Sequence, residues 1–173
     1  MRSKIILIIV LAISAAVFLA YANWHAQPLP AGVIANKVLV EKGERRLTLY
    51  HDEQVLKTYR FVLGGQPIGH KFQEGDSKTP EGKYVVDRRN PHSRFHLALH
   101  LSYPNEADVA RAKRAGVSPG GDIMIHGIRN GFGWIGRLHR VTDWTEGCIA
   151  VTDSEIEEIW RAVPDKTEIT IEP

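Results

Sequence analysis

Short segments in which apolar and polar residues alternate recur along the chain, and turn residues separate them. Residues 37–41 and 46–50 alternate on either side of a polar turn at 42–44, which predicts a β-hairpin. In 95–101 every second residue is apolar. A period of two places successive side chains on opposite faces of a sheet. We therefore expect a domain built mainly of β-strands, with further strands over 55–63, 83–87, 123–125 and 168–171.

Two segments have helical patterns instead. Residues 106–115 are rich in Ala, Arg and Lys, and they are followed by Gly116, a residue typical of helix C-termini. Before the second segment, 153–163, Thr152 stands three positions from Glu155, which is the pattern of a capping box. Together with the strands, these segments predict a β-rich α+β domain with two short helices.

The N-terminal segment 1–22 has the features of an export signal. Arg2 and Lys4 give it a positive start, 5–20 carries no charge, and 20–22 has small residues at the spacing that signal peptidase recognises. The uncharged stretch is shorter than the ~20 residues that span a bilayer comfortably. A cleaved signal peptide and an uncleaved inner-membrane anchor both remain open. In either case we expect the rest of the chain to lie in the periplasm or cell envelope.

After this segment the chain divides into a linker and one domain. Residues 23–33 include Pro28, Pro30 and Gly32, a composition typical of a tether. The remaining residues, 34–173, have the length of a single domain with its own hydrophobic core. We see no internal repeat and no low-complexity tract.

The charge balance argues against a nucleic-acid partner. Without Arg2 and Lys4, the 22 basic residues become equal in number to the 20 acidic ones, so the exported part is near neutral. Nucleic-acid-binding domains usually carry a basic face or a run of Lys and Arg that follows the phosphates. No such run is present. Contact with a membrane is expected only through the N-terminal segment, if it is uncleaved.

Cys148 is the only cysteine of the chain, which is unusual for an exported protein. Exported proteins normally keep their cysteines in disulfides. A single cysteine is therefore half of an intermolecular disulfide, an inert buried side chain or a reactive thiol. A reactive thiol needs a base within hydrogen-bond reach and donors for the oxyanion that its attack creates.

His126 is the best candidate for that base. It directly follows the apolar segment 123–125. The carbonyl oxygen of Gly127 could accept a hydrogen bond from one ring nitrogen of His126, which would leave the other ring nitrogen facing the thiol. Gly147 would permit a close approach to Cys148, and successive backbone amides at 146–148 could form the oxyanion site. The alternative is a cysteine in the core and a strand-end histidine without a chemical role.

Three regularly spaced histidines are the features of the sequence that could indicate a metal site. His92, His96 and His100 recur every four residues, which would cluster three imidazoles on a helix. However, 95–101 alternates with a period of two and is expected to be a strand. On a strand His96 and His100 would lie ~13 Å apart, too far to bind one zinc ion together. We expect no metal site.

The residues around Cys148 form a recognisable combination. His126-Gly127, a glycine-containing stretch and then Thr145-Glu146-Gly147-Cys148 resemble the motif of the L,D-transpeptidase family (YkuD-type catalytic domain). That motif is a His-Gly pair followed by a Ser/Thr-His-Gly-Cys box. The segments 63–65, 79–82 and 102–105 are also similar, so the resemblance extends over 38–171. It implies a mixed or antiparallel, β-sandwich-like catalytic domain without a metal or organic cofactor.

The resemblance implies chemistry on peptidoglycan stem peptides, both donor and acceptor. Cys148 would attack the carbonyl of the third residue of a tetrapeptide stem, and His126 would protonate the leaving D-Ala. The side-chain amine of a second stem would then resolve the thioester into a 3→3 cross-link. With water as acceptor the enzyme would be an L,D-carboxypeptidase, and with a lysine of an envelope lipoprotein it would be an anchoring enzyme. A peptidoglycan-binding module is the non-enzymatic alternative.

One position departs from the family motif. Glu146 stands where the family usually has His, and its carboxylate would raise the pKa of the thiol if it pointed at the sulfur. We expect it to face away, holding a loop or pairing with Arg140 or with an ammonium group of the substrate.

The expected substrate contacts lie mainly between the base and the thiol. Stem peptides carry carboxylates, which Arg can bind through two parallel hydrogen bonds. Arg129, Arg137 and Arg140 lie on the connecting loop, and Arg137, His139 and Arg140 are expected to supply the positive group. Tyr103, in a Tyr-Pro-Asn setting that fits the resemblance, completes the expected set together with Glu146.

Overall fold

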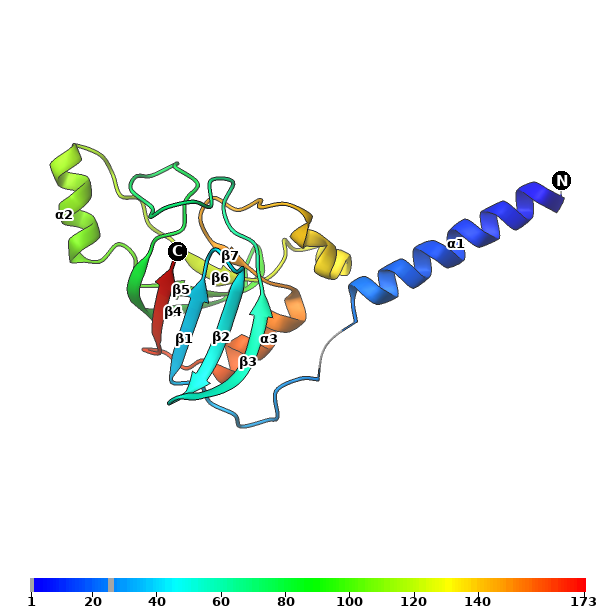
Figure 1. Cartoon of the computed structure of the whole chain (residues 1–173), viewed down its shortest axis with the longest axis horizontal. Coiled ribbons are helices and arrows are strands. Elements are labelled where there is room, and N and C mark those ends of the chain that lie inside the picture. The colour runs from blue at the N-terminus through cyan, green and yellow to red at the C-terminus, as the bar shows by residue number, and fades with distance from the viewer. Residues whose placement is uncertain (1, 25–26) are drawn as a thin grey trace.

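The computed structural model describes residues 2–24 and 27–173 (Figure 1). Helix α1 (Arg2–Ala22) projects away from a domain that contains all the strands. Met1 of the expected export segment and residues 25–26 of the expected linker lie outside the described residues.

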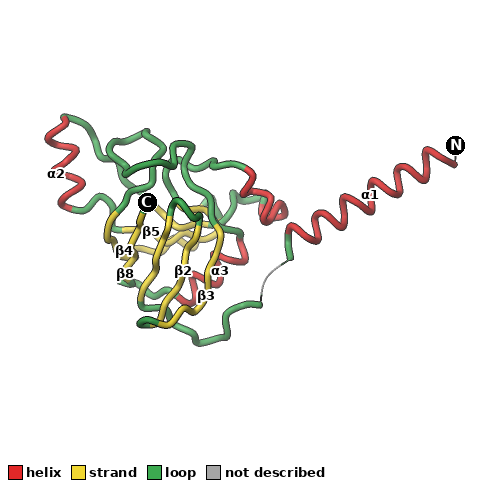
Figure 2. Tube along the Cα trace, in the orientation of Figure 1, coloured by secondary structure: helices red, strands yellow, loops and turns green. Residues whose placement is uncertain are grey.

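The domain is built on a mixed eight-stranded sheet (Figure 2). The spatial order is β3-β2-β1-β8-β4-β5-β6-β7. The pairs β1–β8 and β6–β7 are parallel, and the other neighbours are antiparallel. The expected mixed, β-rich α+β fold is confirmed. The strands are β1 (Lys37–Glu41), β2 (Arg46–His51), β3 (Gln54–Arg60), β4 (Gly82–Ser93), β5 (His96–Leu101), β6 (Met124–His126), β7 (Ile149–Ala150) and β8 (Glu168–Glu172).

Strand β4 joins two halves of this sheet. Its first residues, 82–85, pair with β8, and the part after them pairs with β5. The register shifts between Val86 and Arg88 and again between Asn90 and Ser93, and such irregularities bend a strand. Buried residues of both halves belong to one apolar core, for example Val38 and Leu47 from one half and Leu99 and Ile125 from the other. The arrangement is therefore sandwich-like.

The two predicted helices begin and end where their capping residues indicate. Helix α2 (Glu106–Ala115) starts with a capping box from Asn105 and ends at Gly116, whose φ of 69° is left-handed. Helix α3 (Asp153–Ala162) starts with the predicted capping box of Thr152 and Glu155. Both predictions are confirmed.

A further helical element occupies the stretch expected to be a loop. The 3-10 helix η1 (Gly133–Val141) is interrupted at Gly136, where φ is 49° and ψ is −132°. Strand β4 also continues beyond the predicted end at Asp87. Strand β3 stops at Arg60, and Val62 turns away to form an isolated bridge with Ala150. The 3-10 helix η1 lines the cavity described below.

Gln27 and Leu29, which lie between α1 and β1, contact the domain. Lys57 Nζ donates to the carbonyl oxygen of Gln27 at 2.8 Å, and the amide of Leu29 donates to Glu158 Oε2 at 3.4 Å. Within α1, residues Lys4–Ala22 are long and apolar enough to cross a membrane by length and composition, with a mean hydropathy of 2.9.

Candidate active site

His126 and Cys148 line the same cavity, which has a volume of about 780 Å³. Strand β6 ends at His126, and Cys148 directly precedes β7. These strands are parallel neighbours, with Ile125 opposite Ile149 and His126 opposite Ala150. The sheet therefore brings together two residues that are 22 positions apart in the sequence.

The His126 imidazole is held in one orientation. Its Nδ1 lies 2.7 Å from the carbonyl oxygen of Gly127. A carbonyl oxygen only accepts, so Nδ1 carries the proton and Nε2 keeps a free lone pair. The rings of Phe95 and Trp144 flank it, at 4.6 Å and 5.7 Å between centroids. Burial lowers the pKa of His126 to about 4, although the bond to Gly127 acts in the opposite direction.

The Cys148 thiol is half-buried and neutral. Its Sγ donates to the carbonyl oxygen of Asp122 at 3.5 Å. Burial raises the pKa of Cys148 to about 11; the backbone of Met124 and the ammonium of Lys71 lower it, and the carboxylates of Asp122 and Glu146 raise it. The resting site thus contains an uncharged thiol and an uncharged imidazole rather than a thiolate–imidazolium pair.

The loop before Cys148 is closed by its own hydrogen bonds. Thr145 Oγ1 donates to the carbonyl oxygen of Cys148 at 2.7 Å and accepts from the amide of Gly147 at 3.2 Å. Thr79 Oγ1 donates to the carbonyl oxygen of Gly147 at 2.8 Å. The amide of Gly147, which was expected to be one of the oxyanion donors, is therefore engaged within the loop.

Two glycines allow neighbouring segments to approach this loop. A Cβ atom on Gly64 would lie 2.1 Å from the carbonyl oxygen of Ser77 and 2.7 Å from the amide nitrogen of Gly147. Gly147 itself has a φ of 120°, and a Cβ there would lie 2.4 Å from the carbonyl oxygen of Lys78. The backbone segments around Gly64, around Ser77 and Lys78, and around Gly147 therefore pack directly against one another near the thiol.

Most of the surface that lines the cavity is apolar, although several polar and charged residues also contribute to it. The apolar part comprises Phe95, Ile128, Phe132, Ile135, Leu138 and Trp144, and the polar part comprises Arg94, His126, Arg129, His139, Thr142, Thr145, Glu146 and Cys148. Residues 135, 138 and 139 belong to η1, so this kinked 3-10 helix forms one wall.

Two expected substrate contacts do line the cavity. Glu146 is exposed and makes no ion pair with any described residue, so the expected pair with Arg140 is wrong. His139 is buried, and its Nδ1 accepts from Trp144 Nε1 at 3.4 Å. Its Nε2 has no partner in the described part of the chain. Burial lowers the pKa of His139 to about 4, so this ring is also neutral.

Three other expected contacts lie elsewhere. Tyr103 is 3% exposed, and its hydroxyl donates to the carbonyl oxygen of Pro119 at 2.9 Å, so it belongs to the core. Arg140 forms an ion pair with Glu155 of α3. Arg137 and Arg140 both line a smaller neighbouring pocket and not the one that contains Cys148. The structure therefore does not place these three side chains in the cavity that contains Cys148.

Two arginines replace them in the cavity. The side chains of Arg94 and Arg129 line it and make no ion pair with the residues that the structure describes. Arg129 lies on the expected loop, but Arg94 was missed because it lies far upstream, in the turn between β4 and β5. The amide of Asn130 donates to the carbonyl oxygen of Arg94 at 2.9 Å and joins the two segments. The position of Arg94 in the cavity depends on this tertiary contact and has no signal in the local sequence.

The histidines considered for a metal site have other partners. His96 Nε2 lies 2.8 Å from Glu157 Oε1, and His100 Nδ1 lies 2.5 Å from Asp87 Oδ1. Across residues 2–24 and 27–173, no three His, Cys, Asp or Glu side chains are grouped so that they could hold a metal ion.

Comparison with known proteins identifies the family of the domain. Residues 35–171 match the family model YkuD, described as the L,D-transpeptidase catalytic domain. The chain belongs to this family. The Escherichia coli (strain K12) protein named "Putative L,D-transpeptidase YafK" is 31% identical over 132 residues. That alignment covers 73% of this chain and 46% of YafK, so the chain spans about half the length of the curated relatives it matches.

Solved structures share the fold. The helical cell shape determining protein Pgp2 from *Campylobacter jejuni* superimposes with a TM-score of 0.60 at 26% identity, over 90% of this chain and 54% of Pgp2. The L,D-transpeptidase from *Xylanimonas cellulosilytica* DSM 15894 has a TM-score of 0.51 at 14% identity, over 84% of this chain and 64% of its own. The second likeness shows the fold alone.

Proposed function

We propose that the protein is a cysteine-dependent peptidoglycan L,D-transpeptidase, exported to the cell envelope, that acts on tetrapeptide stems through a Cys148 thioester. The observation that carries this proposal is the His126 imidazole. It is fixed through Nδ1 on Gly127, neutral, and open at Nε2 in the same cavity as the chain's only thiol. A base in this state can accept a thiol proton at neutral pH.

In the acylation step, the thiol proton passes from Cys148 Sγ to His126 Nε2 as the sulfur attacks the donor carbonyl. The bond between the third residue and the terminal D-Ala breaks, and the imidazolium gives its proton to the departing amine. The thioester conserves the energy of the peptide bond. Because the resting thiol has a raised pKa, the proton must move together with the attack rather than before it.

The developing oxyanion needs donors near the sulfur. The amide of Gly147 is occupied by Thr145 Oγ1, which leaves the amides of Glu146 and Cys148 as the proposed donors. Hydrogen bonds from Thr145 and Thr79 fix this loop, so the two amides keep their direction during the reaction.

Charged residues of the cavity are suited to a stem peptide. Arg94 and Arg129 are cations without a carboxylate partner in the described structure, and they fit the free carboxylates of the substrate. Glu146 fits an ammonium group, which the acceptor stem supplies. An amine acceptor then attacks the thioester, its proton passes to His126, and the thiol reforms as the new amide is released. This step gives the 3→3 cross-link.

The test is mass spectrometry of the purified protein incubated with a tetrapeptide muropeptide. We expect release of D-Ala and an acyl adduct on Cys148, followed by a cross-linked dimer when an acceptor stem is added. A carbapenem should add its mass to the same residue. Since Cys148 is the only cysteine, Cys148→Ala removes every thiol and should abolish both adducts.

The products also distinguish the related activities. Release of D-Ala without a dimer makes the enzyme an L,D-carboxypeptidase, and transfer to a lipoprotein lysine makes it an anchoring enzyme. Muropeptide binding without D-Ala release would reduce the protein to a binding module. An adduct that persists in Cys148→Ala would disprove the assignment of the nucleophile.

A further inference from the structure

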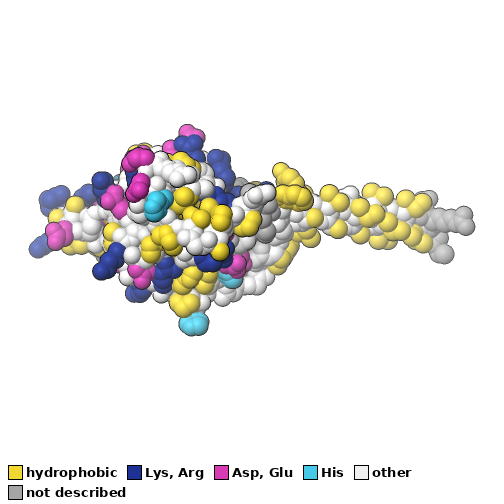
Figure 3. Space-filling model, turned by 90° about the horizontal axis from the view of Figure 1, so that it is seen from below, with side chains coloured by type: hydrophobic (Ala, Val, Ile, Leu, Met, Phe, Trp, Pro, Cys, Tyr) yellow, Lys and Arg dark blue, Asp and Glu magenta, His cyan; other side chains and the backbone are white. Residues whose placement is uncertain are grey.

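Helix α1 has the length of a membrane span. Its apolar part, Lys4–Ala22, has 19 residues, and at 1.5 Å per residue this is about 28 Å, close to the ~30 Å hydrocarbon thickness of a bilayer. Only 6% of its most apolar window is buried against the rest of the protein, so the helix is not a core element. Figure 3 shows its apolar side chains reaching the place where it meets the domain.

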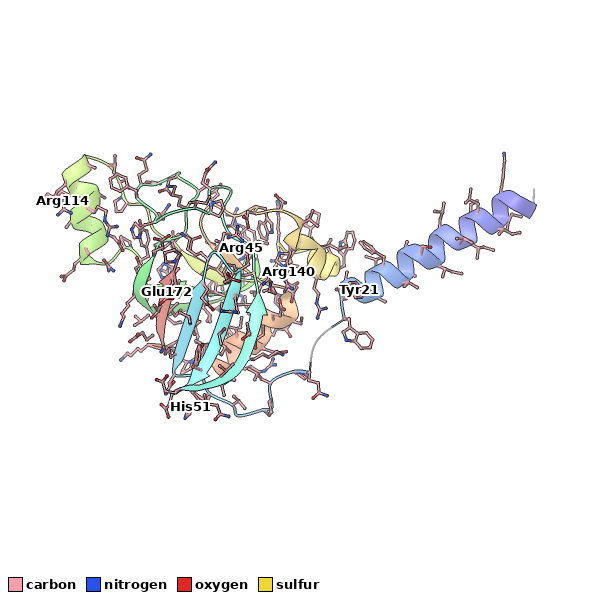
Figure 4. All side chains as sticks on the ribbon, in the orientation of Figure 1. Tyr21, Arg45, His51, Arg114, Arg140 and Glu172 are labelled. Carbon is pink, nitrogen blue, oxygen red and sulfur yellow. The ribbon has the colours of Figure 1, made fainter. Side chains whose placement is uncertain are left out.

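The last turn of α1 is fitted to η1. Ala22 is only 2% exposed. Asn23 Nδ2 donates both to the carbonyl oxygen of Leu19 and to that of Trp134, each at 2.9 Å. A Cβ atom on Gly136 would lie 2.6 Å from the carbonyl oxygen of Ala22, so a glycine is needed there. In Figure 4, Tyr21 lies at the end of α1 that faces η1.

The chain after α1 is also fixed to the domain. The carbonyl of Gln27 accepts from Lys57, and the amide of Leu29 donates to Glu158. With the contact between Asn23 and Trp134, three attachments hold the segment that was expected to be a tether. The orientation of the domain relative to α1 is therefore set by contacts, and the domain does not swing freely at the end of the helix.

Large exposed side chains surround this junction. Tyr21, Trp24 and Trp134 are 71%, 72% and 61% exposed. Phe132 and Val141, at either end of η1, are exposed as well. Trp and Tyr are enriched where membrane proteins cross the bilayer–water interface. Tyr21 lies in the last turn of a helix of membrane-spanning length, Trp24 follows that helix, and Asn23 bonds to Trp134, so the surface that fits these exposed rings is the bilayer itself.

We propose that α1 is retained as a membrane anchor and that the patch of Tyr21, Trp24, Phe132, Trp134 and Val141, here called the junction patch, rests on the outer surface of the membrane. Cleavage after Ala22 would remove a buried residue and the partner of Gly136. The proposal does not depend on the chemistry assigned to Cys148.

The contact of the junction patch with the membrane sets the position of the cavity relative to the membrane surface. Ile135, Leu138 and His139 of η1 line the cavity, whereas Trp134 and Gly136 contact the end of α1. One short segment therefore touches the membrane-facing junction on one side and the proposed substrate on the other. On the function proposed above, on which this consequence rests, the domain acts on peptides presented close to the membrane surface.

The test uses the full-length chain in vesicles of phosphatidylethanolamine and phosphatidylglycerol with brominated acyl chains, which quench nearby tryptophans. We expect quenching of emission, and we expect Trp134→Phe to remove part of the quenched signal. Trp160→Phe is the matched control, since Trp160 lies on α3 against Arg89 and its loss should leave the quenched signal unchanged. If Trp134→Phe loses no quenched signal relative to the unchanged chain, the proposed contact between the junction patch and the membrane is wrong.

A second variant separates docking from simple attachment. Asn23→Leu removes the amide that joins α1 to Trp134, so the Trp134 contribution should disappear while that of Trp24 remains. If Trp134 is quenched as strongly in Asn23→Leu as in the unchanged chain, the docking of α1 on η1 is contradicted. If the protein forms a dimer and shows no quenching, a second copy covers the junction patch and the contact with the bilayer is contradicted.

The anchor is tested by mass analysis of the chain produced in a bacterial host, which must show an intact N-terminal segment. A chain that begins at Asn23 overturns the anchor. Cys148→Ala should retain all the quenching, which keeps this test independent of the proposed activity.

Discussion

At the scale of single residues, the site is set by burial more than by charge. Burial lowers the pKa of His126 to about 4 and raises that of Cys148 to about 11. Both changes favour the neutral forms, so we expect the resting thiol to react slowly with alkylating agents and oxidants. In the proposed reaction, the free lone pair of His126 accepts the thiol proton.

The raised thiol pKa predicts a characteristic alkylation profile. The reactive form is the thiolate, and below its pKa the thiolate fraction rises about tenfold per pH unit. We expect the rate of iodoacetamide labelling of native Cys148 to rise steadily from pH 7 to 10, measured by mass spectrometry. The urea-unfolded chain, with the ordinary thiol pKa of ~8.5, should level off over the same range. A native rate that is already maximal at pH 7 would indicate a preformed thiolate and contradict the neutral pair.

Arg129 and Arg137 offer a matched comparison for substrate binding. Both lie close together in the sequence, but only Arg129 lines the cavity with Cys148. Hydrogen bonds to charged groups contribute about 1.5–3 kcal/mol, so Arg129→Ala should raise KM roughly ten- to hundredfold. Arg137→Ala should leave KM for a tetrapeptide muropeptide unchanged. Equal effects in the two variants would contradict the assignment of the cavity as the substrate site.

At the scale of elements, the site depends on segments that meet only through the tertiary fold. The Cys148 loop is closed by a bridge between Gly64 and Thr145 and by the hydroxyl of Thr79. Strand β7 has only two residues, and it exists because Ile149 and Ala150 find a parallel partner in β6. The Cys148 loop is thus held by contacts with three separate segments, at Gly64, at Thr79 and in β6.

Gly64 and Gly65 test this support directly. A Cβ on Gly64 would overlap the backbone of Ser77 and Gly147, whereas a Cβ on Gly65 would meet no atom within 4 Å. Gly64→Ala should lower the free energy of unfolding by about 3 kcal/mol, as overpacking against backbone does. Gly65→Ala should change it by less than ~0.5 kcal/mol. Urea unfolding measures both, and similar values for the two variants would disprove the close packing.

The same elements show what the sequence could and could not predict. Local signals were sufficient for the hairpin of β1 and β2 and for α3, because alternation and the Thr152–Glu155 box act over a few residues. They could not predict β7 or the extension of β4, because those depend on partners far away in the chain. Tyr103 was misplaced for the same reason: its neighbours in sequence fit a site, but the fold buries it against Tyr84.

At the scale of the whole molecule, the chain consists of one packed domain and one unburied helix. Every fully buried member of the main apolar core lies between Ala35 and Ile171, and α1 contributes none. In the described part of the chain, the last turn of α1 meets the domain at η1. We therefore expect stability to depend on the domain and localisation to depend on α1, while η1 connects the junction with the cavity.

This division predicts the result of removing residues 1–22. Because the core is untouched, the shortened protein should fold and its Tm should match that of the full chain within about 2 °C. The segment 133–141 should behave differently, since Trp134 loses the hydrogen bond from Asn23 and Gly136 loses its contact with Ala22. Amide hydrogen exchange, followed by mass spectrometry, should be faster in 133–141 and unchanged in strands such as β1 and β8. A large fall in Tm would show that α1 stabilises the domain, and unchanged exchange in 133–141 would show that the junction does not restrain η1.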